Sequence, residues 1–367
     1  MKIGIVIRCC RNFGSSRYVV ETSKYFARDN ELHVFTNNWD PLDKRITIHR
    51  IPTIPSNYYI YEGLFFSLST LALKFHSFDV TLAQPTRYLS PDVGEMQFVY
   101  REWLKYVIKN KMYVSPGGRI LALIERHNIK KAKKLIAISN RVKNDILKNY
   151  TVPEEKVRVI YSGVNLEEFN PKHRSKYGEE IRKQYNIPLD DLVLLFIGHP
   201  FHRKGLEFLI RSLPLVNLNN IKVLVFGKDD PEPYQKLISN LRLQDKIIFH
   251  TSLTSEIYKY FAASDIFVLP TLYEPFGLVI LEAMASGLPV VTSQIAGAAE
   301  IIEDERDGLW LKNPKDFKEI AEKLNYLIIN DKVRKQIGKK ARKKAEQYSW
   351  ERTAKGMLEV FEEVAKV

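Results

Sequence analysis

The stretch DIFVLPTLYEPFGLVILEAMASGLPVVTS (Asp265–Ser293) reads as a strand, a helix and a second strand in that order. Its ends, DIFVLP and LPVVTS, are short apolar runs of strand length, and the segment between them has the length and apolar content of a buried helix. Apolar strands that alternate with helices are typical of a parallel sheet covered by helices. This stretch therefore predicts an α/β fold.

The same alternation continues in both directions from this stretch. Further strand-like runs are LVLLFIG, IKVLVFG and KIIFH in the second half and, less regularly, KIGIVIR, ELHVFT, FDVTLAQ and KLIAIS in the first. We expect two Rossmann-like domains that face each other across a cleft, with ligands at the carboxyl ends of the strands. The expected domains are residues 1–165 and 166–349, and residues 350–367 form an amphipathic helix.

Composition and charge limit the classes of protein that are possible. The chain has 367 residues and a net charge of +13. Its longest apolar runs are shorter than the roughly 20 residues that a membrane-spanning helix needs, and the apolar start IGIVI is interrupted by Arg8. The two cysteines, Cys9 and Cys10, are adjacent and form no disulfide framework. These features favour a cytoplasmic globular protein.

The positive charge is concentrated in the first half of the chain. Residues 1–165 contain 26 basic and 14 acidic residues, whereas residues 166–367 contain 30 and 29. The excess is greatest in REWLKYVIKNKMYV (101–114) and RHNIKKAKKL (126–135), where bases alternate with apolar residues. Such segments suit an anionic membrane surface, a nucleic acid or a solvated basic face. We expect the first domain to associate peripherally with the inner face of a membrane, and we expect no nucleic-acid partner.

Two glutamates lie eight residues apart in the opening stretch. Pro275 suits the first position of a helix and Gly287 the position just beyond its end, which places Glu274 at the helix start and Glu282 two turns inside. The unpaired N–H groups at the start of such a helix favour an anion, here a diphosphate. The glutamates would then accept hydrogen bonds from sugar and ribose hydroxyls. Helix capping and a solvated helix face are the ordinary alternatives. The expected donor contacts at the helix start are Phe276, Gly277 and Leu278.

A second candidate lies in FIGHPFHRKGLEFLI, where a strand ends near Gly198 and a helix begins near Gly205. Arg203 and Lys204 lie at the expected N-terminus of that helix. A positive charge there interacts unfavourably with the helix dipole, by about 0.3–1 kcal/mol for each cation. A bound diphosphate would explain them, because arginine grips phosphate oxygens as a fork and lysine acts as a point charge. An exposed basic pair in a loop is the alternative. The sequence contains no spacing of ligands that suggests a bound cation.

Four segments together resemble the retaining glycosyltransferases of family 4, which have the two-domain fold called GT-B. They are EPFGLVILEAMASGLPVV, HRKG, IYSGVNLEEFNP and KLIAISNRVKNDILKNY, in the family's order and spacing. PDVGEMQFVYREW and VFGKDDPEPYQKLISNLRLQDKIIF also resemble the lipopolysaccharide-core α-1,3-glucosyltransferase branch. The resemblance implies that the terminal helix crosses back onto the first domain.

The resemblance also implies roles for individual residues. Glu274 would hold the donor sugar and Glu282 the ribose, while Arg203 and Lys204 would stabilise the leaving diphosphate. The family's amino-terminal loop has paired glycines that approach the donor phosphates, and the resemblance implies that Gly14 and Ser15 take this place here, although Ser15 stands where the second glycine is usual. Asp92 is the substitute that we assign for the family's histidine near the reacting carbon.

The implied reaction is transfer of a hexose from a nucleotide diphosphate sugar, expected to be a UDP-sugar, to a hydroxyl of a glycan or lipid-linked acceptor. The anomeric configuration would be retained, and no cofactor or metal is expected. A nucleotide-sugar 2-epimerase of the same fold, or a basic protein that binds nucleic acid or membrane without catalysis, is the alternative. A dinucleotide dehydrogenase is disfavoured, because the first strand-turn-helix lacks the G-x-G-x-x-G turn.

Overall fold

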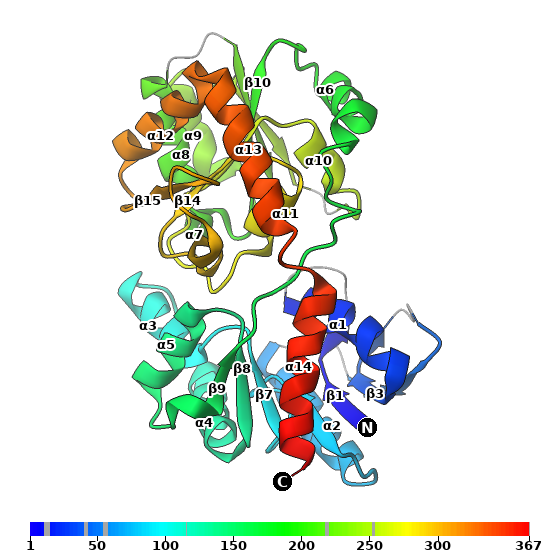
Figure 1. The fold of residues 1–367 in the computed structure, drawn as a ribbon. Coiled ribbons are helices and arrows are strands. Elements are labelled where there is room, and N and C mark those ends of the chain that lie inside the picture. The colour runs from blue at the N-terminus through cyan, green and yellow to red at the C-terminus, as the bar shows by residue number, and fades with distance from the viewer. Residues whose placement is uncertain are drawn as a thin grey trace. The chain divides into compact units, whose positions relative to one another are not determined.

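The computed structural model describes residues 1–10, 15–39, 43–53, 58–114, 116–216, 220–251 and 254–366. The chain separates into two compact units (Figure 1). Unit 1 comprises Met1–Gly163 together with Trp350–Val367, and unit 2 comprises Val164–Ser349. The change of unit falls two residues before the expected boundary at residue 165. Each unit is a parallel sheet with helices, so the predicted α/β class with two Rossmann-like domains is confirmed.

Unit 1 contains a seven-stranded parallel sheet in the order β5-β3-β1-β6-β7-β8-β9. Its strands are β1 (Lys2–Val6), β3 (Glu31–Thr36), β5 (Ile46–Arg50), β6 (Val80–Ala83), β7 (Val93–Met96), β8 (Lys134–Ala137) and β9 (Val157–Val159). A separate pair joins β2 (Cys9–Cys10) to β4 (Asn38–Trp39). The order reverses between β1 and β6, because the chain first adds strands on one side of β1 and then on the other.

The helices of unit 1 connect these strands. They are α1 (Ser15–Asp29), α2 (Tyr58–Leu73), α3 (Tyr100–Lys109), α4 (Pro116–Lys131) and α5 (Asn140–Asn149). The last helix of the chain, α14 (Trp350–Ala365), also belongs to unit 1. It packs on α1 through Phe26 against Phe361 and Tyr18 against Trp350. The predicted return of the terminal helix to the first domain is therefore confirmed.

Unit 2 contains a six-stranded parallel sheet in the order β12-β11-β10-β13-β14-β15. Its strands are β10 (Leu192–Ile197), β11 (Ile221–Phe226), β12 (Ile247–His250), β13 (Ile266–Leu269), β14 (Val290–Ser293) and β15 (Leu309–Leu311). The order reverses between β10 and β13, which pair directly through Leu194 with Ile266 and Leu195 with Phe267. Ligands bind at such a reversal, beyond the carboxyl ends of the strands.

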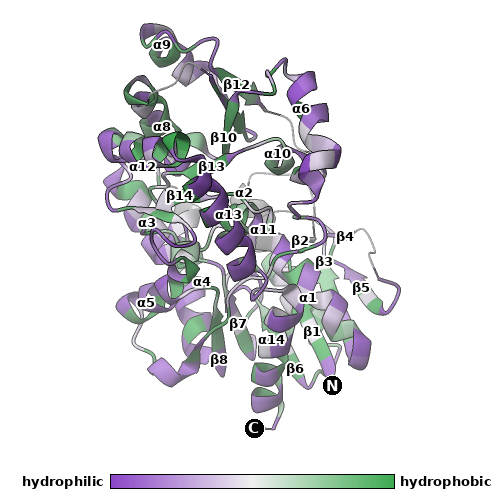
Figure 2. Cartoon of the chain, turned by 45° about the horizontal axis from the view of Figure 1, so that its top comes forward, coloured by the Kyte–Doolittle hydropathy of each residue, from purple (hydrophilic) through white to green (hydrophobic). Residues whose placement is uncertain are grey.

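The helices of unit 2 are α6 (Glu179–Gln184), α7 (Phe201–Lys204), α8 (Leu206–Ser212), α9 (Glu232–Asn240), α10 (Tyr258–Ala262), α11 (Leu278–Ala285), α12 (Phe317–Ile329) and α13 (Asp331–Ala345). Strands of the sheet are hydrophobic and buried, whereas α13 is strongly hydrophilic (Figure 2). In the part of the chain that the structure describes, no helix combines the length and apolar character needed to cross a membrane.

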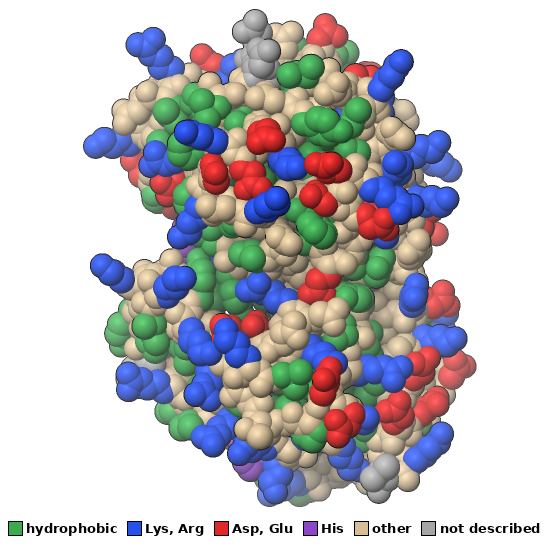
Figure 3. All heavy atoms as spheres, turned by 60° about the vertical axis from the view of Figure 1, so that its left-hand side comes forward, with side chains coloured by type: hydrophobic (Ala, Val, Ile, Leu, Met, Phe, Trp, Pro, Cys, Tyr) green, Lys and Arg blue, Asp and Glu red, His purple; other side chains and the backbone are tan. Residues whose placement is uncertain are grey.

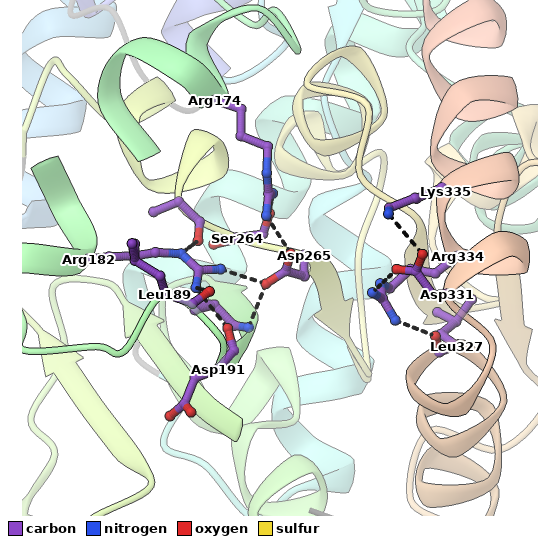
Figure 4. A network of polar contacts seen from close by, with 12 residues as sticks. Arg174, Arg182, Leu189, Asp191, Ser264, Asp265, Leu327, Asp331, Arg334 and Lys335 are labelled. Atoms are coloured by element: carbon purple, nitrogen blue, oxygen red, sulfur yellow. Dashed lines mark hydrogen bonds and ion pairs between the residues drawn. The ribbon is translucent and has the colours of Figure 1, made fainter. Parts of the chain in front are cut away.

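A buried ionic network fixes the amino ends of β10 and β13 (Figure 4). Arg182 donates to the carboxylate of Asp265 at 2.7 Å and to the carbonyls of Ala263, Pro188, Leu189 and Asp191. The same carboxylate accepts from the amide of Val193 at 2.8 Å and from Arg174 at 2.6 Å. This network lies at the edge of the sheet opposite the carboxyl ends, and it holds the two central strands in register there.

Candidate active site

The loops that follow β10 and β13 meet at the carboxyl edge of the sheet in unit 2, because the two strands are neighbours. The first loop leads into α7 and carries Arg203 and Lys204. The second runs through Thr271 and Glu274 to α11. Backbone hydrogen bonds join them, since the amide of Leu272 donates to the carbonyl of Arg203 at 2.8 Å. The predicted basic pair and the first predicted glutamate are thus brought together.

Lys204 and Glu274 form a buried ion pair. The ammonium of Lys204 contacts Oε2 of Glu274, and both residues are only 7% exposed. Burial lowers the pKa of Lys204, and the negative charge of Glu274 opposes that shift. Arg203 approaches the same carboxylate oxygen at 3.8 Å. Two cations therefore converge on one carboxylate at the reversal point of the sheet.

Arg203 also fixes the shape of the site through its guanidinium. It donates to the carbonyl of Tyr273 at 2.7 Å and to the carbonyl of His199 at 2.9 Å. These two carbonyls belong to different loops, so Arg203 joins the loop after β10 to the loop after β13. Arg203 therefore positions the two loops in addition to bringing a positive charge to the site.

Three glycines allow this close packing. A Cβ at Gly198 would come within 2.5 Å of the Lys204 stem. Gly205 has φ +80°, and a Cβ there would lie 2.0 Å from the carbonyl oxygen of Pro270. At Gly297, whose amide donates to the carbonyl of Glu274 at 3.1 Å, a Cβ would meet the carbonyl oxygen of Pro275 at 2.0 Å. Glycine is required at these close approaches of backbone to backbone or to a buried stem.

Sequence reasoning did not identify several residues that support the site. The hydroxyl of Thr271 donates to the carbonyls of Arg203 and Tyr273, at 3.2 and 3.3 Å. The hydroxyl of Ser293, at the end of β14, donates to the carbonyl of Thr271 at 2.7 Å. Nothing in the local sequence marks these hydroxyls, because the contacts of Thr271 with Arg203 and of Ser293 with Thr271 join parts of the chain that are far apart in sequence. Gly198 and Gly205 were used in the sequence analysis only as the end of a strand and the start of a helix, although they also indicate the close packing found here.

The start of α11 differs from the prediction. The helix begins at Leu278 rather than at Pro275, because Gly277 has φ +100°, a left-handed conformation that interrupts the helical backbone before Leu278. Glu274, Pro275 and Phe276 are therefore part of the loop. Gly287, with φ +77°, does lie just beyond the end of the helix as predicted. Glu282 is inside α11 and 5% exposed, so the solvated-face alternative does not apply to it.

The setting of Arg203 and Lys204 also differs from the prediction. A helix does begin just after Gly205, but the two cations already belong to the last turn of the preceding one-turn helix α7. The left-handed backbone at Gly205 separates the two helices. In a helix of four residues the first and last turns coincide, so the position of the cations in α7 does not by itself indicate a bound anion. The convergence of the cations on Glu274 is the stronger reason to assign them to a site.

Asp92 does not lie at the carboxyl edge of its sheet. It precedes β7, and its carboxylate accepts from the amide and hydroxyl of Thr81 at 2.9 and 2.7 Å. Its carbonyl accepts from the amides of Lys133 and Lys134. These contacts tie together the amino-terminal ends of β6, β7 and β8, so we withdraw Asp92 as a catalytic residue. It was assigned from the sequence only as a substitute for the family's histidine.

The predicted loop residues of unit 1 are only partly described. Gly14 lies outside the described residues, and Ser15 is the first residue of α1, without a described side chain. Among the described residues, no group of three or more histidine, cysteine or acidic side chains is arranged to hold a metal ion.

The fold is shared with solved two-domain glycosyltransferases. Over 98% of this chain the fold matches WaaG, a glycosyltransferase involved in lipopolysaccharide biosynthesis, with a TM-score of 0.83, 22% identity and 99% of that chain covered. It also matches HepE of Anabaena, solved in complex with UDP and glucose, with a TM-score of 0.78, 20% identity and coverage of 99% of this chain and all of HepE.

Two glycosyltransferase family models match parts of the chain. Residues 178–344 match the model for glycosyl transferases group 1, and residues 98–168 match the model for glycosyltransferase family 4. An uncharacterised glycosyltransferase of Methanocaldococcus jannaschii is 33% identical over 232 residues, which are 62% of this chain and 59% of that relative. The chain thus spans about 60% of the length of this relative. The matched residues thus lie in both units, and they resemble glycosyltransferases of group 1 and of family 4.

Proposed function

We propose that the chain transfers a hexose from a nucleotide diphosphate sugar, a UDP-sugar, to a hydroxyl of a glycan or lipid-linked acceptor, and that the anomeric configuration is retained. The observation that carries this proposal is the convergence of Arg203, Lys204 and Glu274 at the reversal point of the sheet in unit 2. HepE, which shares the fold, was solved with UDP and glucose, and this supports the choice of donor.

The ion pair between Lys204 and Glu274 gives the site its chemistry. A buried ammonium needs a negative partner, and the diphosphate of a donor supplies one. When the diphosphate engages Lys204, the carboxylate of Glu274 is released to accept hydrogen bonds from hydroxyls of the sugar. As the glycosidic bond breaks, negative charge grows on the diphosphate, and preorganised cations stabilise that charge most strongly in the transition state. In the complex with the donor, Lys204 would therefore bind the diphosphate and Glu274 would bind the sugar.

Helix α11 adds two further contacts in this proposal. The amides at its start, at Leu278 and Val279, together with the left-handed turn at Gly277, suit an anionic group. Glu282 lies one turn inside the helix and is assigned to the ribose hydroxyls. The side chain of Phe276 is buried, and its carbonyl accepts from the amide of Ala298 at 2.8 Å. Arg203 and Lys204 supply the positive charge, so we propose that the reaction proceeds without a metal.

The experiment that tests the function uses the purified chain with a panel of nucleotide sugars and candidate glycan acceptors. We expect acceptor-dependent release of UDP in the presence of EDTA, and a product whose anomeric configuration by proton NMR equals that of the donor. An inverted product, or a requirement for magnesium or manganese, would contradict the mechanism. Release of a free 2-epimeric sugar without an acceptor would identify the epimerase instead.

The acceptor side of the proposal rests on a surface of unit 1, which we call the α3–α4 surface. Large apolar side chains are more than a third exposed at Ile108, Met112, Tyr113, Ile120 and Leu123. Exposed basic residues lie among them, at Lys109, Lys111, Arg119, Arg126 and Lys130. Figure 3 shows basic side chains gathered among apolar ones over unit 1, in the lower part of the view. We propose that this surface binds an anionic membrane and places the enzyme beside a lipid-linked acceptor.

A further inference from the structure

Glu95 is a buried carboxylate to which the proposed reaction assigns no role. It lies within β7 and is 1% exposed. Burial disfavours the ionised form and raises the pKa of Glu95 to about 7. An apolar residue would fill the same place in the sheet without this cost. Buried groups with shifted pKa values are concentrated at functional sites, so Glu95 is a candidate for a role in function.

Two glutamines bind the Glu95 carboxylate at the carboxyl edge of the sheet in unit 1. Gln84 is the first residue after β6, and Gln97 is the first residue after β7. Nε2 of Gln97 donates to Oε1 of Glu95, and Gln84 adds a second side-chain hydrogen bond. Ala83 pairs with Gly94, so the next residues of the two chains, Gln84 and Glu95, lie side by side. We call Gln84, Glu95 and Gln97 the Glu95 cluster.

The Glu95 cluster lies next to the reversal of strand order in unit 1. β6 lies between β1 and β7, and the order reverses between β1 and β6. Ligands of such sheets bind beyond the carboxyl ends of the strands at a reversal. Both glutamines are half-buried, and Phe98, directly after Gln97, is 38% exposed. Amides beside an exposed aromatic ring suit a sugar, which has hydroxyl groups at its edge and apolar faces.

The charge of Glu95 fixes the orientation of the two amides. An ionised carboxylate only accepts hydrogen bonds, so each glutamine turns its NH2 group toward Glu95 and its carbonyl oxygen away from it. The Glu95 cluster then offers two oriented carbonyl oxygens, and such oxygens accept hydrogen bonds from hydroxyl groups. A protonated Glu95 donates one hydrogen bond, so one amide has to turn over and present its NH2 group instead. The ionised form is therefore the one that suits hydroxyl groups.

The titratable group that faces Glu95 is Tyr18 of α1. Burial, and then the negative charge of Glu95, raises the pKa of Tyr18. The residue beside Glu95 on β8 is Ile136, and the residue on the β6 side is Gln84. In the described part of the chain, no basic side chain lowers the pKa of Glu95. A change of charge at Glu95 is therefore transmitted through the two glutamines that bind it.

We propose that Glu95 is a positioning residue that holds the amides of Gln84 and Gln97, and that the carbonyl oxygens of these amides bind hydroxyl groups of the acceptor sugar. This inference rests on the proposed function, and it assigns the acceptor to unit 1. The two glutamines determine how the acceptor is oriented, and Glu95 acts through them. Since the ionised form of Glu95 is the competent one, use of the acceptor should improve as the pH rises through about 7.

The test uses the full chain with a donor and an acceptor that react in the panel above, and it measures kcat and KM for both substrates between pH 5.5 and pH 9. We expect kcat/KM for the acceptor to fall about tenfold for each pH unit below about 7, because the protonated form is not competent. KM for the donor should change much less. Glu95→Gln should lack this pH dependence, and its kcat/KM for the acceptor at pH 8 should be about tenfold lower, the scale of one lost hydrogen bond.

Glu125→Gln is the matched control. Glu125 is another buried glutamate of unit 1, and burial raises its pKa to about 7, but it accepts from the amides of Tyr100 and Arg101 at the start of α3. Its replacement should leave the pH dependence for the acceptor unchanged. Gln97→Met removes one carbonyl oxygen, so it should raise KM for the acceptor about tenfold while KM for the donor stays the same. A merely structural cluster would show lower stability in the Glu95 and Gln97 variants, with the acceptor kinetics and pH dependence of the wild type.

The outcomes also distinguish this inference from the proposed function. If a donor and an acceptor react but Glu95→Gln keeps the pH dependence, or Glu125→Gln loses it, the inference is wrong and the donor site stands. If no pair reacts, the proposed function fails. Saturation-transfer NMR with methyl α-glucoside, methyl α-galactoside and methyl α-mannoside at pH 6 and pH 8 then decides the role of the Glu95 cluster. At least one glycoside should bind more strongly at pH 8 to the wild type but not to Glu95→Gln, and the absence of this difference would overturn the inference.

Discussion

Lys204 and Glu274 neutralise each other in one buried contact, so a change in either residue alters the environment of the other. This pairing could not be foreseen from positions 70 residues apart. It also alters how substitutions at the two positions should be read. Removing the carboxylate leaves a buried positive charge that a nucleotide diphosphate can neutralise, whereas removing the ammonium leaves a negative charge that repels it.

Lys204→Met and Glu274→Gln should therefore have different effects. Lys204→Met should lower turnover by about a hundredfold, the scale on which one preorganised electrostatic partner acts, and it should also weaken UDP binding. Glu274→Gln should lower turnover at least as severely while UDP affinity stays equal or rises. Calorimetry with UDP, alongside turnover with one donor, checks both outcomes. A loss of UDP binding in Glu274→Gln as large as in Lys204→Met would show that the glutamate is only structural.

Glu95 of unit 1 gives a prediction on pH at the scale of one residue. Burial raises the pKa of Glu95 to about 7, although hydrogen bonds from Gln97 and Gln84 oppose that rise. In the unfolded chain its pKa is near 4.5, so between these values the folded state binds more protons. The free energy of unfolding should therefore fall as pH rises from about 4.5 to 7, by a contribution on the order of 3 kcal/mol at most.

Glu95→Gln should remove this pH dependence, because a glutamine does not ionise. Urea unfolding of the wild type and the variant at pH 5 and pH 8, monitored for unit 1, measures the contribution. We expect the stability of the variant relative to the wild type to increase at pH 8. An equal difference at both pH values would mean that Glu95 is ionised in the folded state throughout this range.

At the scale of elements, the amino ends of the strands in unit 2 stabilise the sheet, whereas their carboxyl ends carry the candidate site. The amino ends of β10 and β13 are fixed by Arg182 and Asp265, whereas their carboxyl ends carry the loops of the site. Gly205 belongs to the second edge, because it separates α7 from α8 and packs against the carbonyl of Pro270. Changes at the two edges should therefore affect different properties.

Gly205→Ala should displace α7 from the loop after β13, because a Cβ would overlap the carbonyl oxygen of Pro270 and the φ of +80° is strained for alanine. We expect turnover to fall at least tenfold. The matched control is Arg182→Met, which breaks a buried ion pair and should lower the free energy of unfolding by about 3 kcal/mol. The folded fraction of that control should retain wild-type turnover. Equal turnover in Gly205→Ala and wild type would show that α7 is not part of the site.

At the scale of the whole molecule, charge and exposed apolar area distinguish the two units. The α3–α4 surface combines both features in unit 1, where exposed Ile120 and Leu123 are one helical turn apart on α4. A membrane that attracts the basic residues would also accept these apolar side chains. The association should therefore depend on both salt and apolar contact.

Co-sedimentation with vesicles tests this association. Binding to vesicles that contain phosphatidylglycerol should exceed binding to phosphatidylcholine vesicles, and it should weaken between 50 and 500 mM salt, as screening lengths of about 10 Å at 0.1 M predict. Ile120→Ser with Leu123→Ser should reduce binding severalfold. Leu189→Ser, which changes a leucine of unit 2 that is 65% exposed, is the matched control. Equal binding to both kinds of vesicle would contradict the role of charge.

The longer strands could be predicted from the sequence because most of their residues are apolar, as in β10, which is apolar throughout, and β11, in which Lys222 is the one polar residue. β5, β9 and β15 were not predicted, since they are edge strands of only three to five residues. β7 was not predicted although it is internal, because Gly94 and Glu95 interrupt its apolar pattern. Its burial comes from its neighbours in the sheet.

The sequence by itself determined the α/β class, the two units, the family resemblance and the candidate residues Arg203, Lys204 and Glu274, because these depend on local periodicity and on short motifs. Only the tertiary structure decided which residues are partners. Parallel pairing brought Lys204 to Glu274 and Gln84 to Glu95, and it placed Asp92 at the opposite edge of its sheet. Such contacts join residues that are far apart in the chain, so strand order and direction determine them, and no local pattern contains that information.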